Sequence, residues 1–133
     1  MGGIREISES MELPLVEKEL TQEKINRYAE VSGDLNPLHI DSRFAENTPF
    51  GGTIAHGMLV LSSLSELMEQ AFGRRWVTSG RIKARFRGAA RPDDHLTTSG
   101  TVGKVDDGRV MCHLECRNQE GTLLVSAEAM VTL

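Results

Sequence analysis

The chain has 133 residues, a net charge of −4, and 39% hydrophobic and 26% charged residues. This length is typical of one domain and allows roughly 70% of the unfolded surface to be buried, so folding requires neither disulfides nor a metal. The acidic balance argues against general nucleic-acid binding. No apolar run reaches the roughly 20 residues that a membrane span requires. We therefore expect a soluble, cytoplasmic protein that binds neither nucleic acid nor membrane.

The polar and acidic residues 1–12 contain no apolar core, so we expect a flexible lead-in there rather than a signal peptide. One domain over residues 13–133 follows. The two cysteines, Cys112 and Cys116, lie in one expected strand, where roughly 13 Å would separate them. We expect two free thiols, which suit a reducing compartment.

The first elements of the domain are a short strand and a helix. The strand is expected over residues 13–20. Thr21 is suited to cap a helix over residues 22–31, because its hydroxyl can accept a bond from a free amide of the first turn. Gly33 should end this helix, and a loop should follow over residues 34–39.

The longest apolar segment, residues 55–72, predicts the central element of the fold. It is apolar around most of its circumference, which is typical of a buried helix. A short helix capped by Asp41 and a loop over residues 48–53 should precede it. Gly73 should end it.

From Trp76 onward, apolar and polar residues alternate, which predicts strands. Four strands joined by tight turns are expected, and Asp106-Asp107-Gly108 is typical of a hairpin turn. Strands with one polar face suit an antiparallel sheet, whose apolar face must cover another element. The pattern therefore predicts an α+β fold in which a curved antiparallel sheet wraps around one long central helix.

An acid and an imidazole, Asp34 and His39, lie five positions apart around Pro37. Because Pro37 disfavours helix for the residue before it, the chain can turn here and direct both side chains at one place. Histidine titrates near neutral pH and a carboxylate can orient it, which suits general acid–base catalysis. A simple turn with an ordinary histidine explains the same residues, so both interpretations stay open.

A second pair, His56-Gly57, opens the long helix. The amide of Gly57 would be an unpaired donor at the positive end of the helix dipole, where it could stabilise an oxyanion. Alternatively, the glycine permits tight packing and His56 is a core histidine. Serines within an apolar helix, such as Ser65, usually bond back to a carbonyl one turn earlier. No Gly-x-Ser-x-Gly motif is present, so a serine nucleophile is not expected.

Seven of the 15 basic residues lie between Arg74 and Arg91, among them Arg85 and Arg87. They form either the solvated face of a strand or a docking patch for coenzyme A phosphates or an acidic carrier protein. The histidines show no metal-ligand spacing, and phosphate-loop and dinucleotide motifs are absent. We therefore expect neither a metal nor a cofactor.

Residues 28–39, Tyr-Ala-Glu-Val-Ser-Gly-Asp-Leu-Asn-Pro-Leu-His, closely resemble the motif of the MaoC-like (R)-specific enoyl-CoA hydratases and 3-hydroxyacyl-thioester dehydratases. Residues 54–59, Ile-Ala-His-Gly-Met-Leu, resemble the second motif of that family, at the expected interval. The resemblance covers nearly the whole chain and implies a single hot-dog domain. It also implies a lyase of lipid metabolism that reversibly hydrates trans-2-enoyl thioesters of coenzyme A or acyl carrier protein to (R)-3-hydroxyacyl thioesters.

The resemblance implies a role for each matching residue. Asp34 and His39 would be a catalytic dyad that holds one water. The Gly57 amide would bind the thioester oxygen, and Ser65 would lie near the dyad. No cofactor is implied, because water and the thioester supply every atom.

Supporting residues follow from the same resemblance. Asn36 would shape the loop, and His56 would support the helix entry. Met58 and Leu61 are candidates to line the acyl pocket. Because hot-dog units pair with active sites near the interface, a homodimer is implied, or a heterodimer with a related subunit.

Two other functions compete with this one. A hot-dog acyl-CoA thioesterase would usually place a carboxylate on the central helix near the thioester, whereas Glu66 and Glu69 lie far from the start of that helix. A non-catalytic acyl-CoA-binding module, or the structural half of a heterodimeric dehydratase, would not need the intact Asp34 and His39.

Overall fold

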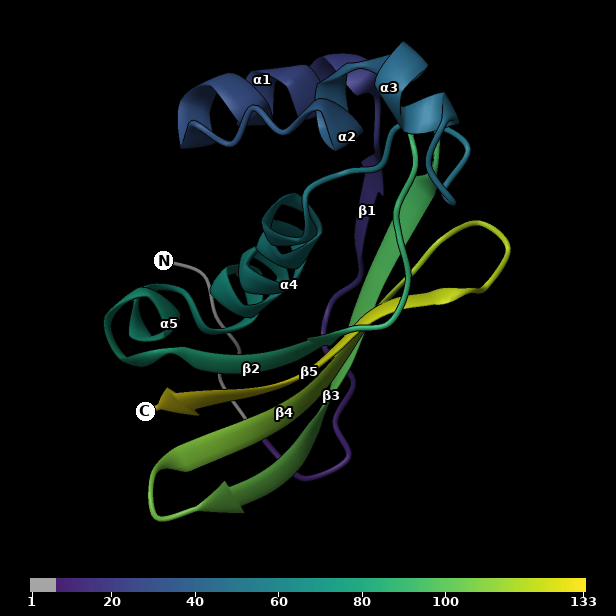
Figure 1. Ribbon diagram of the computed structural model, residues 1–133. Coiled ribbons are helices and arrows are strands. Elements are labelled where there is room, and N and C mark those ends of the chain that lie inside the picture. The colour runs from purple at the N-terminus through teal and green to yellow at the C-terminus, as the bar shows by residue number, and fades with distance from the viewer. Residues whose placement is uncertain (1–6) are drawn as a thin grey trace.

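A five-stranded antiparallel sheet curves around the long helix α4 (Gly57–Phe72) in the computed structural model, which describes residues 7–133 (Figure 1). The strand order is β1-β3-β4-β5-β2. The strands are β1 (Val16–Glu19), β2 (Arg81–Phe86), β3 (His95–Asp106), β4 (Arg109–Arg117) and β5 (Leu123–Thr132). The expected α+β hot-dog architecture is confirmed.

Helix α4 is buried because its apolar residues meet the apolar face of every long strand. Leu64, Leu67 and Met68 are fully buried on the helix. Alternate residues of the strands supply the other side of the core, for example Val102, Val110, Leu114, Val125 and Val131. The opposite face of the sheet carries the polar partners of this alternation, as the expected pattern required.

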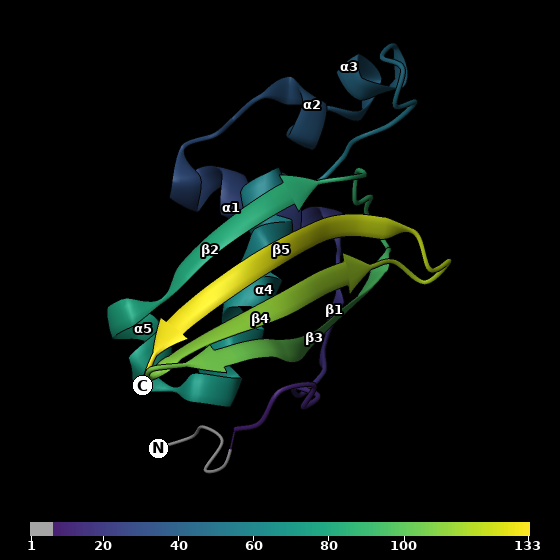
Figure 2. The same ribbon diagram turned by 90° about the horizontal axis from the view of Figure 1, so that it is seen from below.

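Three helices lie beyond α4 on the side away from the sheet: α1 (Gln22–Ser32), α2 (Pro37–Ile40) and α3 (Ser42–Glu46) (Figures 1 and 2). Thr21 caps α1 as expected, and Gly33 ends it with a φ of 81°. The predicted loop over residues 34–39 is partly wrong, because Pro37 begins α2 and His39 lies in that helix. Proline is favoured at the first helical position, and the Asn36 side chain caps the turn by accepting from the Leu38 amide.

The N-terminal segment begins to pair with β3 at a residue closer to the N-terminus than expected. The regular strand β1 is shorter than the predicted residues 13–20, but the Ser10 amide already donates to the Val102 carbonyl at 2.8 Å. The Leu13 amide donates to Gly100 at 2.9 Å. The flexible lead-in and the domain boundary at residue 13 remain predictions, and residues 1–6 of that lead-in lie outside the described part of the chain.

Two features of the C-terminal half differ from the sequence prediction. Residues after Gly73 form a short helix, α5 (Arg74–Ser79), so the strand begins only at Arg81. Six residues are too few to show helical periodicity, so the sequence pattern from Trp76 onward does not distinguish this helix from a strand. In addition, β2 pairs with β5 and not with β3, so residues 87–94 cross between non-adjacent strands. The expected turn before β3 is present within this crossover, because the Asp94 amide donates to the Arg91 carbonyl at 3.1 Å.

The hairpin and cysteine predictions are confirmed. Asp107 and Gly108 both have positive φ, 52° and 77°, as the two-residue turn between β3 and β4 requires. Cys112 and Cys116 are free and buried. Burial raises the pKa of Cys112 to about 11 and also raises the pKa of Cys116, so both thiols stay protonated at neutral pH.

Within residues 7–133, none of the helices combines the length and apolar character that crossing a bilayer demands.

Candidate active site

Three segments that are separate in the sequence meet at the start of α4. Asp34 follows α1, His39 lies in α2, and His56 immediately precedes α4. One side-chain nitrogen or oxygen from each of these residues lies within 4.8 Å of the others. The structure therefore brings together the acid and the imidazole that the sequence placed five positions apart.

The ring of His39 is held in one orientation. Its Nδ1 lies 2.8 Å from the carbonyl oxygen of Ile54. Because a carbonyl only accepts, Nδ1 carries the hydrogen, and the lone pair of Nε2 is left to act on a ligand. The backbone of His39 is held as well, since its carbonyl accepts from the Gln22 side chain at 2.8 Å.

Asp34 is exposed, and its carboxylate is only partly occupied. Oδ1 accepts from the Asn36 amide at 3.3 Å, which shapes the turn into α2. The Ser32 hydroxyl accepts from the Asp34 amide at 3.2 Å. The backbone of Asn36 thus contacts Asp34 within this turn, and the Asp34 carboxylate has capacity left for a further hydrogen bond.

His56 is buried between the dyad and α1. Its Nε2 lies 3.0 Å from the backbone carbonyl of Asp34. Its ring stacks on that of His39, with centroids 3.9 Å apart and planes inclined by 28°. On the other side, Tyr28 meets it edge to face with centroids 4.9 Å apart. His56 therefore contacts both halves of the candidate dyad.

The same three residues form the one cluster of possible metal ligands found among residues 7–133. The contacts of the histidines argue against a metal there. His39 and His56 face each other through their ring planes rather than their lone pairs, and a carbonyl occupies Nε2 of His56. These contacts suit acid–base chemistry better than metal binding.

Gly57 is the first residue of α4, and its helix start has no side-chain cap. Thr21, Asn36 and Asp41 each cap their helices, whereas His56 does not. The described residues offer no acceptor to the amide of Gly57. The glycine also faces an aromatic ring, because a Cβ at this position would lie 2.9 Å from Cε1 of Phe86.

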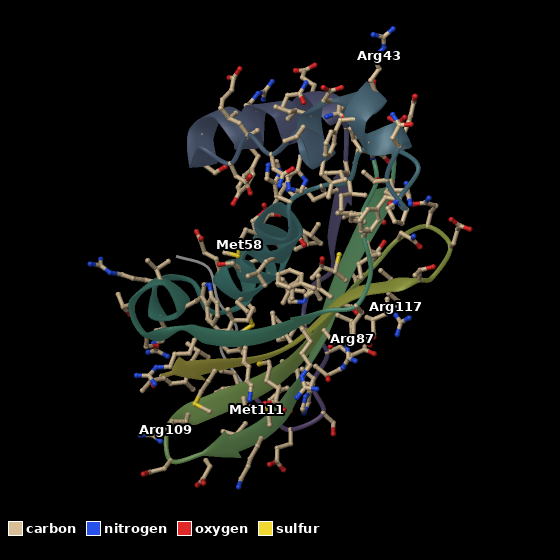
Figure 3. All side chains as sticks on the ribbon, in the orientation of Figure 1. Arg43, Met58, Arg87, Arg109, Met111 and Arg117 are labelled. Atoms are coloured by element: carbon tan, nitrogen blue, oxygen red, sulfur yellow. The ribbon has the colours of Figure 1, made fainter. Side chains whose placement is uncertain are left out.

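The other residues of α4 that were predicted for the site lie at different distances from the start of the helix. Gly57, Leu61 and Ser65 recur every four residues and so share one stripe of the helix. Leu61 is half-buried against the core, and Met58 is 58% exposed beside it (Figure 3). Ser65 accepts from the Trp76 indole at 2.9 Å, which ties α4 to α5. Roughly 12 Å of helix axis separates Ser65 from Gly57.

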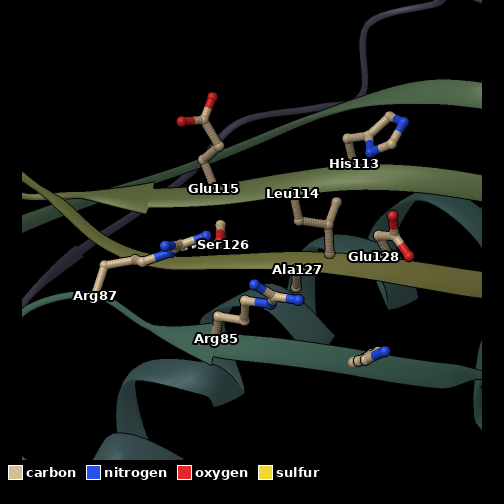
Figure 4. A pocket seen from close by; sticks show the side chains of 9 residues that line it. Arg85, Arg87, His113, Leu114, Glu115, Ser126, Ala127 and Glu128 are labelled. Carbon is tan, nitrogen blue, oxygen red and sulfur yellow. Dashed lines mark hydrogen bonds between the residues drawn. The ribbon is translucent and has the colours of Figure 1, made fainter.

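Arg85 and Arg87 point to the outer face of the sheet, opposite to Phe86, which packs beside Gly57. They line a hollow of about 500 Å³ together with Lys83, His113, Glu115, Ser126 and Glu128 (Figure 4). No ion pair of Lys83, Arg85 or Arg87 is found within residues 7–133. We call this feature the outer hollow; it is basic but does not adjoin the dyad.

Sequence reasoning missed three residues that build the site. Gln22 holds the His39 carbonyl and accepts from Thr53 at 2.6 Å. The backbone of Ile54 orients His39, and Tyr28 packs on His56. Tyr28 stands within the motif of residues 28–39, which was a usable signal. Gln22 carried no such signal in the sequence, because an amide side chain in the first turn of a helix is usually solvated.

Comparisons with known proteins identify the family and agree with the fold. Residues 7–122 match the family described as MaoC like domain. A 3-hydroxybutyryl-CoA dehydratase of Methylorubrum extorquens is 30% identical over 131 residues, which cover 92% of this chain and 81% of that protein. A solved (R)-hydratase from A. caviae involved in PHA biosynthesis superposes with a TM-score of 0.85 at 26% identity, covering 98% of this chain and 99% of that one.

A third relative is much longer. The beta subunit of Saccharomyces cerevisiae fatty acid synthase is 32% identical over 111 residues, which cover 78% of this chain but 5% of that subunit. The chain thus corresponds to one small part of such a relative. The match over residues 7–122 and the 30% identity to a protein of similar length lead to one conclusion. This chain belongs to the MaoC-like domain family.

Proposed function

We propose that this protein reversibly hydrates trans-2-enoyl thioesters to (R)-3-hydroxyacyl thioesters, with Asp34 and His39 as the catalytic dyad. The observation that carries the proposal is the convergence of Asp34, His39 and the uncapped start of α4 at one place. The relatives named as a hydratase and a dehydratase support the reaction class.

The dyad would activate one water. With its hydrogen on Nδ1, His39 has the Nε2 lone pair available to take a proton from water. The free part of the Asp34 carboxylate would hold the second hydrogen of that water. The hydroxyl adds to C3, and the proton removed from water is delivered to C2, so the dyad ends unchanged. Dehydration is the reverse path.

The Gly57 amide would bind the thioester oxygen. Charge develops on that oxygen as C2 gains enolate character, and a preorganised amide at a helix start typically contributes about 3–4 kcal/mol. The half-buried Leu61 lies one turn further along the same stripe and would contact the acyl chain. Met58 would join it, and Ser65 would lie at the far end of this stripe.

The thioesterase alternative receives less support. Glu66 forms an ion pair with Lys18 at 2.9 Å, on the side of α4 that faces β1. Glu69 is exposed. Neither carboxylate is therefore directed at the start of α4. Release of free coenzyme A from saturated acyl-CoA would nevertheless favour the thioesterase.

Replacement of Asp34 by Asn should lower the rate of crotonyl-CoA hydration by at least about 100-fold, because the amide cannot accept both hydrogen bonds of a carboxylate or stabilise a positive imidazolium. The melting temperature should change little, since Asp34 is exposed. Asp107→Asn is the matched control, because asparagine also tolerates the positive φ of that turn. Full activity of Asp34→Asn would refute the dyad.

The Gly57 amide can be tested by comparing Gly57→Pro with Gly57→Ala. Both variants add a Cβ beside Phe86, but only proline removes the N–H, and proline is favoured at this helical position. We expect kcat of the proline variant to fall about 100-fold below that of the alanine variant. Equal kcat values in two folded variants would exclude this amide as the oxyanion donor.

We also propose that the protein forms a homodimer through β2. This strand lies at the edge of the sheet with β5 as its one partner, so its outer backbone groups can pair with a second copy. Phe86 and Met58 are 54% and 58% exposed on the same side of the molecule as Gly57. Pairing would cover them and place two active sites near one interface.

Light scattering should give twice the chain mass of 14.6 kDa. The double variant Met58→Glu/Phe86→Glu should shift the protein toward monomer, because it places charges in the interface. Val77→Glu changes an exposed apolar residue of α5 and should leave the dimer intact. A wild-type mass of 14.6 kDa would contradict the homodimer; activity appearing only with a related subunit would indicate a heterodimer.

The outer hollow is our candidate for carrier docking. Three cations, Lys83, Arg85 and Arg87, face two carboxylates, and one of these, Glu115, already pairs with Arg117. The surplus charge would attract an acidic partner. Because Arg85 and Arg87 point away from the Gly57 side of the sheet, an acidic carrier protein suits them better than the phosphates of coenzyme A.

Arg85→Glu/Arg87→Glu should raise KM for an enoyl thioester of acyl carrier protein about 10-fold at low salt, with kcat unchanged and a smaller effect at high salt. KM for crotonyl-CoA should change less. Arg81→Glu, on the same face of β2 but outside the hollow, is the control. Unchanged KM for both carriers would refute the proposal.

A further inference from the structure

Among the contacts of the site, those of His56 are not explained by acid–base chemistry alone. The side chain is 3% exposed and sits between Tyr28 and His39. Its Nδ1 is buried and has no hydrogen-bond partner within residues 7–133. A buried polar atom without a partner costs about 1–3 kcal/mol, so its retention requires a reason.

The partner of Nε2 supplies that reason. The acceptor is the backbone carbonyl of Asp34, so the hydrogen must lie on Nε2 and the lone pair on Nδ1. The bond holds the backbone of Asp34 at 3.0 Å from a buried ring. Among residues 7–133, the other hydrogen bonds of Asp34 are local contacts within its own turn, to Ser32 and Asn36. His56 therefore links the exposed turn to the core.

The ring of His56 also limits the motion of His39. The ring centroids are 3.9 Å apart, so the ring of His39 cannot rotate toward that of His56 without a clash. The hydrogen bond to Ile54 fixes the same ring at its edge. The stack on His56 thus fixes the plane of the His39 imidazole, and the hydrogen bond to Ile54 fixes the direction in which its nitrogens point.

His56 is also continuous with the helix start. It is the N-cap residue of α4, and its carbonyl accepts from the amides of Leu59 and Val60 at 3.1 and 3.3 Å. Gly57 is the next residue. A single residue therefore contacts Asp34 and His39 and is bonded to the residue whose amide would bind the thioester oxygen.

We propose that His56 is a positioning residue that fixes Asp34, His39 and the Gly57 amide relative to one another. It acts through these groups and exchanges no proton with the substrate. This inference rests on the proposed hydratase function for its kinetic consequence, but its geometric part does not depend on activity.

Two complementary variants separate the two contacts of His56. In His56→Phe the ring stack is kept and the hydrogen bond to Asp34 is lost. In His56→Gln the side-chain N–H can still reach the Asp34 carbonyl, but the stack is lost. We expect each to lower kcat for crotonyl-CoA about 10- to 100-fold, as small misplacements of catalytic groups do, while KM changes less than about threefold. His95→Gln, a surface change outside the site, is the control.

Nuclear magnetic resonance provides a readout that is independent of activity. Long-range ¹H–¹⁵N spectra of the wild type should show His56 with its hydrogen on Nε2 and His39 with its hydrogen on Nδ1. The His39 tautomer should become mixed in His56→Gln, where the stack that holds the ring against the Ile54 carbonyl is lost, and should stay on Nδ1 in His56→Phe, where the stack is kept. A His56 hydrogen on Nδ1 in the wild type would overturn the proposal even if neither variant folds.

The outcomes are distinguishable from those of the proposed function. If the wild type hydrates no enoyl thioester but the tautomers are as expected, the hydratase assignment fails and the positioning geometry stands. If both folded variants keep kcat within about twofold of the wild type, His56 does not position the dyad. A loss of melting temperature alone, with kcat retained, would show a purely structural role.

Discussion

Burial of α4 in the hollow of the curved sheet is the constraint on which the rest of the molecule depends. Leu64, Leu67 and Met68 leave no freedom for the helix to slide or turn, because each is fully enclosed by the inner residues of the strands. The N-terminal end of the helix is thereby fixed in position. A donor amide at that end is preorganised without any contact to a ligand.

The candidate active site is assembled beside this fixed helix end from exposed residues. Residues 34–40 comprise a turn and one helical turn, and most of them are exposed. They are held by few but specific bonds: Gln22 to the His39 backbone, Ile54 to the His39 ring and His56 to the Asp34 backbone. The two side chains proposed to reach substrate are exposed or half-buried, whereas His56, which holds the backbone of one and the ring of the other, is buried.

The two faces of β2 carry side chains of different chemistry. Phe86 faces the start of α4, whereas Arg85 and Arg87 face the outer hollow. Alternation along a strand enforces this division, because successive side chains point to opposite faces. Under the proposed function, the acyl thioester and its carrier would contact the protein on different sides of the same edge strand.

Much of this protein could be predicted from its sequence because the relevant signals are local. Periodicity predicted the buried helix at residues 55–72 and the alternating strands, and turn chemistry predicted the hairpin at Asp107-Gly108. The caps at Thr21 and Asp41 also depend on only a few neighbouring residues. For the same reason the two motifs, residues 28–39 and 54–59, could be recognised as a pair.

The tertiary structure decided what depends on contacts between distant segments. Pairing of β2 with β5 and the helix α5 follow from how the sheet closes on α4. The sequence placed Asp34 and His39 near each other, but only folding brought in His56, Ile54 and Gln22, which lie 15 to 22 residues from their partners in the site. A hydrogen bond between such segments leaves no periodic trace in the chain, so it becomes visible only when the backbone brings donor and acceptor together.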